Sequence, residues 1–193
     1  IRLFNAIALG FVGHAKGGPA KVAVLSSGFM GMISGSGVAN VLTVGQFTIP
    51  LMKRFGYTPV FAGAVEATAS MGGQIMPPVM GAVAFIMAET LNLPYAEIVK
   101  AAIIPALLYY FTAFTMVHLE AGRGKLMGLP KAQCPNPWKH MRENWYLLVP
   151  LAILVFMLFD GFTPEFAGMM GLCMTALLIL GAAVAARIHP TVF

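Results

Sequence analysis

The sequence predicts an all-helical, polytopic membrane protein. Hydrophobic residues make up 59% of its 193 residues and charged residues only 10%, whereas a soluble domain is typically about 25% charged. The mean hydropathy of +0.81 agrees with this composition. At about 20 apolar residues per crossing, the chain has room for a handful of membrane spans. We expect these spans, rather than a cleavable signal peptide, to direct insertion into the bilayer.

Two stretches interrupt the apolar helical pattern, and they point to a site in the middle of the membrane. Residues 31–40 read Gly-Met-Ile-Ser-Gly-Ser-Gly-Val-Ala-Asn, and residues 72–81 read Gly-Gly-Gln-Ile-Met-Pro-Pro-Val-Met-Gly. Gly, Pro, Ser and Asn all weaken a helix and leave backbone groups unpaired. Because unpaired backbone groups are tolerated at this depth only beside a polar cavity, paired interruptions predict the ion and substrate site of a secondary transporter.

The first of these stretches predicts a re-entrant helical hairpin. It separates two apolar arms of about a dozen residues each, 22–33 and 39–52, and this length reaches only half-way across a bilayer. Basic residues lie at both open ends of the hairpin, as a segment that does not cross requires. The whole chain is predicted to contain these segments in order: the end of a preceding helix with a cytoplasmic turn over 1–19, the hairpin over 20–54, a broken transmembrane helix over 58–92, a transmembrane helix over 95–118, a basic cytoplasmic loop over 119–143, and transmembrane helices over 144–159 and 164–187.

Charge asymmetry predicts the orientation of these segments. With the hairpin mouth and the basic loop in the cytoplasm, nine of the twelve Lys and Arg residues lie there, and Arg187 makes ten. Lys100 then faces the other compartment and Arg2 is unassigned. Because cytoplasmic loops carry the excess of Lys and Arg, we expect positions 124 and 161 to face opposite sides. Trp138 and Trp145 flank the basic end of the 119–143 loop and predict that it is interfacial.

The interrupted stretches carry the oxygen atoms that a small cation binds. Ser34, Ser36 and Asn40 lie at the deepest point of the hairpin, where one helix exposes its last carbonyls and the next its first amides. The second stretch offers the oxygens of Gln74 and of the backbone over 72–73, with the hydroxyls of Thr68 and Ser70 just before it, and its prolines keep the helix open. The alternative for both stretches is helix packing, since small residues permit close contact and kinked helices are common in membranes.

Glu66 is the only acidic residue well inside a predicted span. A carboxylate at this depth is a functional candidate, although it can equally pair with a lysine or with the lipid-facing end of the hairpin. The two cysteines, Cys134 and Cys173, suggest neither a disulfide nor a metal site. The chain has no Gly-x-x-x-x-Gly-Lys-Ser/Thr phosphate cradle and no histidine inside a span, and its basic residues are scattered over loops. We therefore expect neither an enzyme, nor a nucleotide-driven pump, nor a nucleic-acid partner.

Long ordered motifs resemble a known family. Residues 34–40, 45–53, 56–57 and 65–82, with 109–110, 118 and 120–121 beyond them, are similar to the large, DctM-like membrane subunit of the tripartite ATP-independent periplasmic (TRAP) transporters. The form in which the small and large membrane subunits are fused is the most similar. The resemblance is dense over about 17–89 and looser up to the basic loop.

The resemblance implies a sodium-coupled importer of organic acids in a bacterial or archaeal cytoplasmic membrane. Its partners would be a periplasmic substrate-binding protein and a small membrane subunit, separate or fused. Na⁺ would be the coupling ion, and no cofactor is implied. Transport would use the elevator motion of an inverted-repeat protein of the ion transporter superfamily. This chain would be about half of such a transport unit. We expect it to be a fragment of a longer chain.

Carried over by position, the ion- and substrate-binding residues are Ser34, Gly35, Ser36, Asn40, Gly72, Gly73, Gln74 and Pro77, with Ser34, Ser36 and Gly73 as sodium ligands and Glu66 as a further candidate. Family members often have a second Ser or Ala where this chain has Gly37, which leaves open whether a hydroxyl or only a carbonyl contributes there. Two other functions fit the same segments: a sodium/dicarboxylate symporter without a binding protein, and a membrane scaffold whose broken helices only pack.

Overall fold

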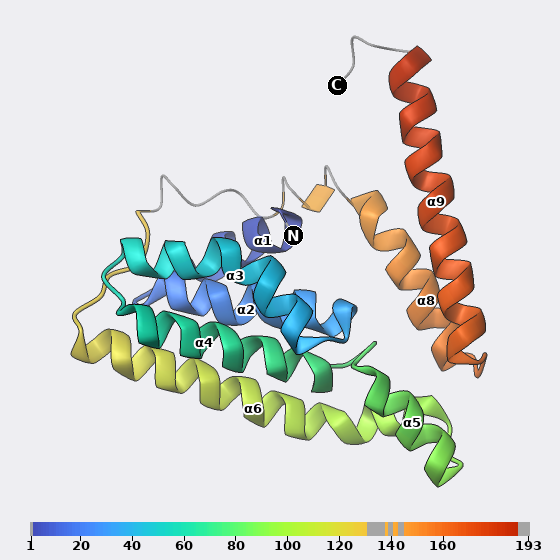
Figure 1. Ribbon diagram of the computed structural model, residues 1–193, viewed down its shortest axis with the longest axis horizontal. Helices are drawn as coiled ribbons and strands as arrows, with labels where there is room; N and C mark the ends of the chain where they lie inside the picture. The colour runs from blue at the N-terminus through green and yellow to red at the C-terminus, as the bar shows by residue number, and fades with distance from the viewer. Residues whose placement is uncertain (1, 131–137, 139–140, 143–144, 189–193) are drawn as a thin grey trace.

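The computed structural model describes residues 2–130, 138, 141–142 and 145–188, and every regular element among them is a helix (Figure 1). The prediction of an all-helical protein is therefore confirmed for this part of the chain. Two of its helices are long and apolar enough to cross a membrane, Tyr95–Arg123 and Pro164–Gly181.

The first interrupted stretch forms a hairpin of two helices, α2 (Gly18–Ser34) and α3 (Gly37–Arg54). Only Gly35 and Ser36 separate them. Gly35 has the left-handed φ of 63° and its N–H bonds to the Gly31 carbonyl, which ends α2. This backbone conformation strains residues that carry a Cβ. Ser36 is extended and its hydroxyl accepts from the Ala39 N–H, which begins α3.

The second interrupted stretch breaks the helix that follows. Helix α4 (Pro59–Gly72) begins at the Thr58 cap, ends at Gly72, and passes into the 3₁₀ turn η1 (Gly73–Ile75). Residues 76–81 are irregular and include a cis bond between Pro77 and Pro78, before α5 (Ala82–Leu91) begins. The Gly81 N–H donates to the Gln74 carbonyl at 2.8 Å and closes this loop.

Helices α2, α3 and α4 pack side by side and share one core (Figure 1). Small side chains allow this close approach, because most of the buried positions between these helices are alanine or valine. The fully or almost fully buried members of this core are Ala20, Ala23, Val24, Met52, Ala62, Val65 and Ala69. The hairpin and the first half of the broken helix therefore form one body.

Helix α6 (Tyr95–Arg123) runs along α4 and α2 (Figure 1). The sequence placed the start of the basic loop at 119, and this boundary is wrong, because α6 continues for another turn. Ala121 is fully buried in the core beside Val117, and the Gly124 N–H caps the helix on the Glu120 carbonyl. Tertiary contact thus holds a turn that the local charge pattern assigned to a loop.

The remaining elements are α1 (Arg2–Val12), the 3₁₀ turn η3 (Trp145–Leu148), and the antiparallel pair α8 (Val149–Phe159) and α9 (Pro164–Ile188). The start of the basic loop is tied to the turn before the hairpin, since Gly17 N–H donates to Leu126 O and Leu129 N–H to Gly13 O. Part of the loop predicted to be interfacial, residues 131–137, 139–140 and 143, lies outside the described residues.

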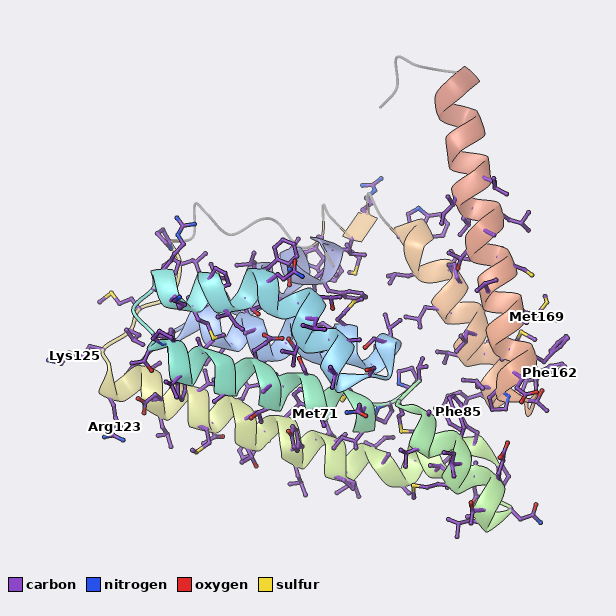
Figure 2. The ribbon with its side chains drawn as sticks, in the orientation of Figure 1. Met71, Phe85, Arg123, Lys125, Phe162 and Met169 are labelled. Carbon is purple, nitrogen blue, oxygen red and sulfur yellow. The ribbon has the colours of Figure 1, made fainter. Side chains whose placement is uncertain are left out.

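The basic residues of the hairpin mouth and of the end of α6 lie at one end of the helical layer. Figure 2 shows Arg123 and Lys125 there, and Phe162 at the opposite end of the molecule. Exposed cysteines replacing Arg123 and Phe162 should therefore react with an impermeant thiol reagent from opposite sides of the membrane, in a protein whose native cysteines have been replaced. We choose Phe162 rather than Gly161, because Gly161 has a φ of 89° that strains any other residue. Reaction of both from the periplasmic side would contradict the orientation.

Candidate functional site

The hairpin tip sits on the broken end of α4, and glycines form the contact. A Cβ at Gly73 would lie 2.5 Å from the Gly31 Cα, and a Cβ at Gly35 would lie 3.1 Å from the Met80 carbonyl oxygen. A Cβ at Gly37 would overlap the Met71 sulfur. Figure 2 shows Met71 at the end of α4 where the break begins. Backbone thus meets backbone at this junction, and larger residues have no room.

The structure brings the predicted hairpin residues to one place beside the break. Ser34 and Ser36 are exposed at the tip, where Ser34 Oγ donates to the Ser36 carbonyl at 3.4 Å. Gln74 is half-buried on the facing side, with its amide nitrogen 3.5 Å from the Met71 sulfur. The other predicted residues there are Gly35, Gly72, Gly73 and Pro77. Hydroxyl, amide and backbone oxygens are hard ligands of the kind that small cations take.

Asn40 lies behind the tip and is fully buried. Its amide nitrogen donates to the Ser27 carbonyl at 2.8 Å and to Ser70 Oγ at 3.1 Å. Its Oδ1 atom is buried without a hydrogen-bond partner in the part of the chain that the structure describes. A buried acceptor without a donor is costly and rare. This oxygen is therefore suited to an ion or to a hydrogen bond that a bound ligand completes.

Glu66 is fully buried at the centre of α2, α3 and α4. Its Oε1 accepts from Ser27 Oγ at 2.6 Å and from Ser70 Oγ at 3.0 Å, and its Oε2 accepts from Thr48 Oγ1 at 2.5 Å. Among the described residues, no Lys or Arg forms an ion pair with it. The carboxyl group therefore joins both arms of the hairpin to α4, with Ser70 leading toward the break.

Sequence reasoning missed Ser27 and Thr48 as members of this network. Each arm carries two hydroxyl residues, Ser26 with Ser27 and Thr43 with Thr48. Such residues usually bond to their own helix, as Thr48 Oγ1 also does with the Val44 carbonyl at 3.1 Å. Nothing in the spacing links Ser27 or Thr48 to Glu66, 39 and 18 positions away. The sequence predicted Ser70 as an oxygen ligand for a cation near the break. The structure places it between Glu66 and Asn40, with a hydrogen bond to each.

Comparison with known proteins gives the chain's relatives. The family model described as the DctM component of the tripartite ATP-independent periplasmic transporters matches residues 1–190. The sialic acid TRAP transporter large permease protein SiaM of Vibrio cholerae is 29% identical over 164 residues, covering 84% of this chain and 38% of that protein. The C4-dicarboxylate large permease protein DctM of Pseudomonas aeruginosa is 29% identical over 154 residues, covering 79% and 36%. The 2,3-diketo-L-gulonate large permease protein YiaN of Escherichia coli is 28% identical over 158 residues, covering 81% and 37%. The chain thus spans less than half the length of these relatives.

Proposed function

The chain belongs to the DctM-component family of TRAP transporters, and from this premise we propose that it is part of a sodium-coupled permease importing organic acids that a periplasmic binding protein delivers. Membership makes it a membrane transport component. The named relatives carry sialic acid, C4-dicarboxylates or 2,3-diketo-L-gulonate, and each of these compounds is an acid. On this ground we propose a carboxylate substrate. From the family membership we propose a small membrane subunit as partner and a multi-pass location in the cytoplasmic membrane.

The contact between the hairpin tip and the broken end of α4 is the observation that carries this proposal. At the tip, α2 ends and α3 begins within two residues, so a partial negative and a partial positive helix end lie side by side. We propose that Ser34, Ser36 and the Gly73 carbonyl bind Na⁺. The free amides at the start of α3 would bind the substrate carboxylate, as helix N-termini bind anions. The remaining predicted residues, Gly35, Asn40, Glu66, Gly72, Gln74 and Pro77, would shape or complete the site.

We propose that α2, α3 and α4 move together during transport. They share one core, and Glu66 joins the hairpin arms to α4 by two hydrogen bonds, one from Ser27 of α2 and one from Thr48 of α3. Both ends of the hairpin carry basic residues, Lys16 and Lys21 at its start and Lys53 and Arg54 at its end, so the hairpin enters and leaves the membrane on the cytoplasmic side. Such a body is suited to the elevator motion that the resemblance implies.

Replacing Ser36 with alanine is expected to weaken sodium activation moderately. Losing one hydroxyl ligand costs roughly 1 to 2 kcal/mol, which is about a 5- to 30-fold higher half-activating sodium concentration. The measurement is uptake by the complete transporter in proteoliposomes as external sodium is varied. Ser36→Thr, which keeps the hydroxyl and the helix cap, should stay close to the parent. Equal behaviour of both variants and the parent would remove this hydroxyl from the ion site.

One experiment separates the proposed function from its alternatives. Substrate uptake is measured in proteoliposomes with and without the binding protein, under a sodium or a potassium gradient. We expect uptake only with both sodium and the binding protein. Sodium-driven uptake without the binding protein would indicate a stand-alone symporter, and no uptake of any organic acid under either gradient would indicate a scaffold.

A further inference from the structure

Two adjacent tyrosines of α6 reach the last turn of α4, just before the break. Tyr109 Oη donates to the Thr68 carbonyl at 2.8 Å, and Tyr110 Oη donates to the Ala69 carbonyl at 3.0 Å. Both rings fit against glycines. A Cβ at Gly28 would lie 3.0 Å from the Tyr110 ring, and a Cβ at Gly72 would overlap the Tyr109 ring. These contacts fix both tyrosines against the body that carries the candidate site.

The two carbonyls differ in what else they can bond. In an uninterrupted helix the Gly73 N–H would donate to the Ala69 carbonyl, but here it donates to Ser70 and Met71 as the helix tightens into η1. The break therefore takes away the regular backbone donor of the Ala69 carbonyl, which lies among apolar helices where a lost partner is costly. The Thr68 carbonyl differs, because its regular donor is the N–H of Gly72, four residues later, and Gly72 is still in α4. Tyr110 thus supplies a replacement donor, whereas Tyr109 adds a second one.

We propose that Tyr110 is a positioning residue that holds α4 open at Gly73. The Tyr110 hydroxyl donates to the Ala69 carbonyl. This carbonyl therefore no longer needs the Gly73 N–H as its donor, and Gly73 is not drawn back to regular helix geometry. Gly73 then keeps its backbone against Gly31, where a Cβ would come within 2.5 Å of the Gly31 Cα. The effect on sodium binding rests on the proposed function, whereas the effect on the backbone of the break does not.

Amide hydrogen exchange tests the structural part in the complete transporter held in nanodiscs. Tyr110→Phe keeps the ring packed against Gly28 and removes only the hydroxyl. Tyr109→Phe is the matched control. Without the Tyr110 hydroxyl the Gly73 N–H should return to the Ala69 carbonyl, so exchange at the start of residues 73–76 should slow about five-fold in Tyr110→Phe. The control should change it much less. Equal changes in the two variants, or none in Tyr110→Phe, would overturn the proposal.

Sodium activation tests the positioning role. Tyr110→Phe should raise the half-activating sodium concentration about five-fold with an unchanged maximal uptake rate per folded protein, because the site is present but less often in the binding geometry. A general loss of stability would instead lower the maximal rate. If sodium does not drive uptake in the parent protein, the proposed function fails, and the exchange difference between the two tyrosine variants still decides the role of Tyr110.

Discussion

Replacing Gly73 with valine is expected to abolish uptake. The first added carbon would lie 2.5 Å from the Gly31 Cα and 2.8 Å from the Gly31 carbonyl carbon. Both are backbone atoms, so the clash is relieved only by moving the hairpin away from the broken helix, which takes apart the proposed site. The measurement is sodium-driven uptake in proteoliposomes, normalised to the amount of folded transporter, and we expect a loss of at least about 100-fold.

Gly63→Val is the matched control for this substitution. Gly63 lies in the same helix, but a Cβ there meets no atom within 4 Å. It should retain most of the uptake rate, apart from the small cost of valine in a helix. If Gly73→Val transports as well as Gly63→Val, the contact between the tip and the break is not required for transport, and the glycines return to a packing role.

Replacing Glu66 with alanine is expected to destabilise the protein by roughly 2 to 5 kcal/mol. The change removes the acceptor of three hydroxyls, from Ser27, Thr48 and Ser70, and leaves them buried around a space that the side chain filled. The measurement is the thermal unfolding midpoint of the purified transporter in detergent. Glu89→Ala, at an exposed position of α5, is the control and should leave the midpoint nearly unchanged. Equal midpoints for the two variants would show that the Glu66 carboxyl does not hold the three helices together.

The broken helices were predictable because their causes are local. The turn at Gly35 and Ser36 requires one left-handed residue and one helix cap, and the sequence supplies a glycine and a serine there. The break after Gly72 follows from two glycines and two prolines close together in one apolar segment. The interruption itself is therefore encoded locally at both places, whereas the proposed role of Tyr110 in fixing the backbone at Gly73 depends on how α6 meets α4.

The partners of Glu66 and the end of α6 were not predictable in the same way. Helices α2 and α4 are apolar on nearly every side, so no apolar stripe shows how each is rotated toward its neighbours. The meeting of Glu66 with Ser27 and Thr48 depends on those rotations. The last turn of α6 depends on the burial of Ala121 against other helices, which local charge does not report.

The fused arrangement of small and large subunits stays a prediction.

In the proposed function, the hairpin tip and the broken end of α4 together bind one sodium ion. Amide hydrogen exchange of the complete transporter, followed as sodium replaces potassium at constant ionic strength, tests it most directly. Sodium should slow exchange over residues 34–40 and 72–77 with the same midpoint concentration, because one ion orders both segments. Slowing in neither segment, in only one, or at two clearly different sodium concentrations would contradict it.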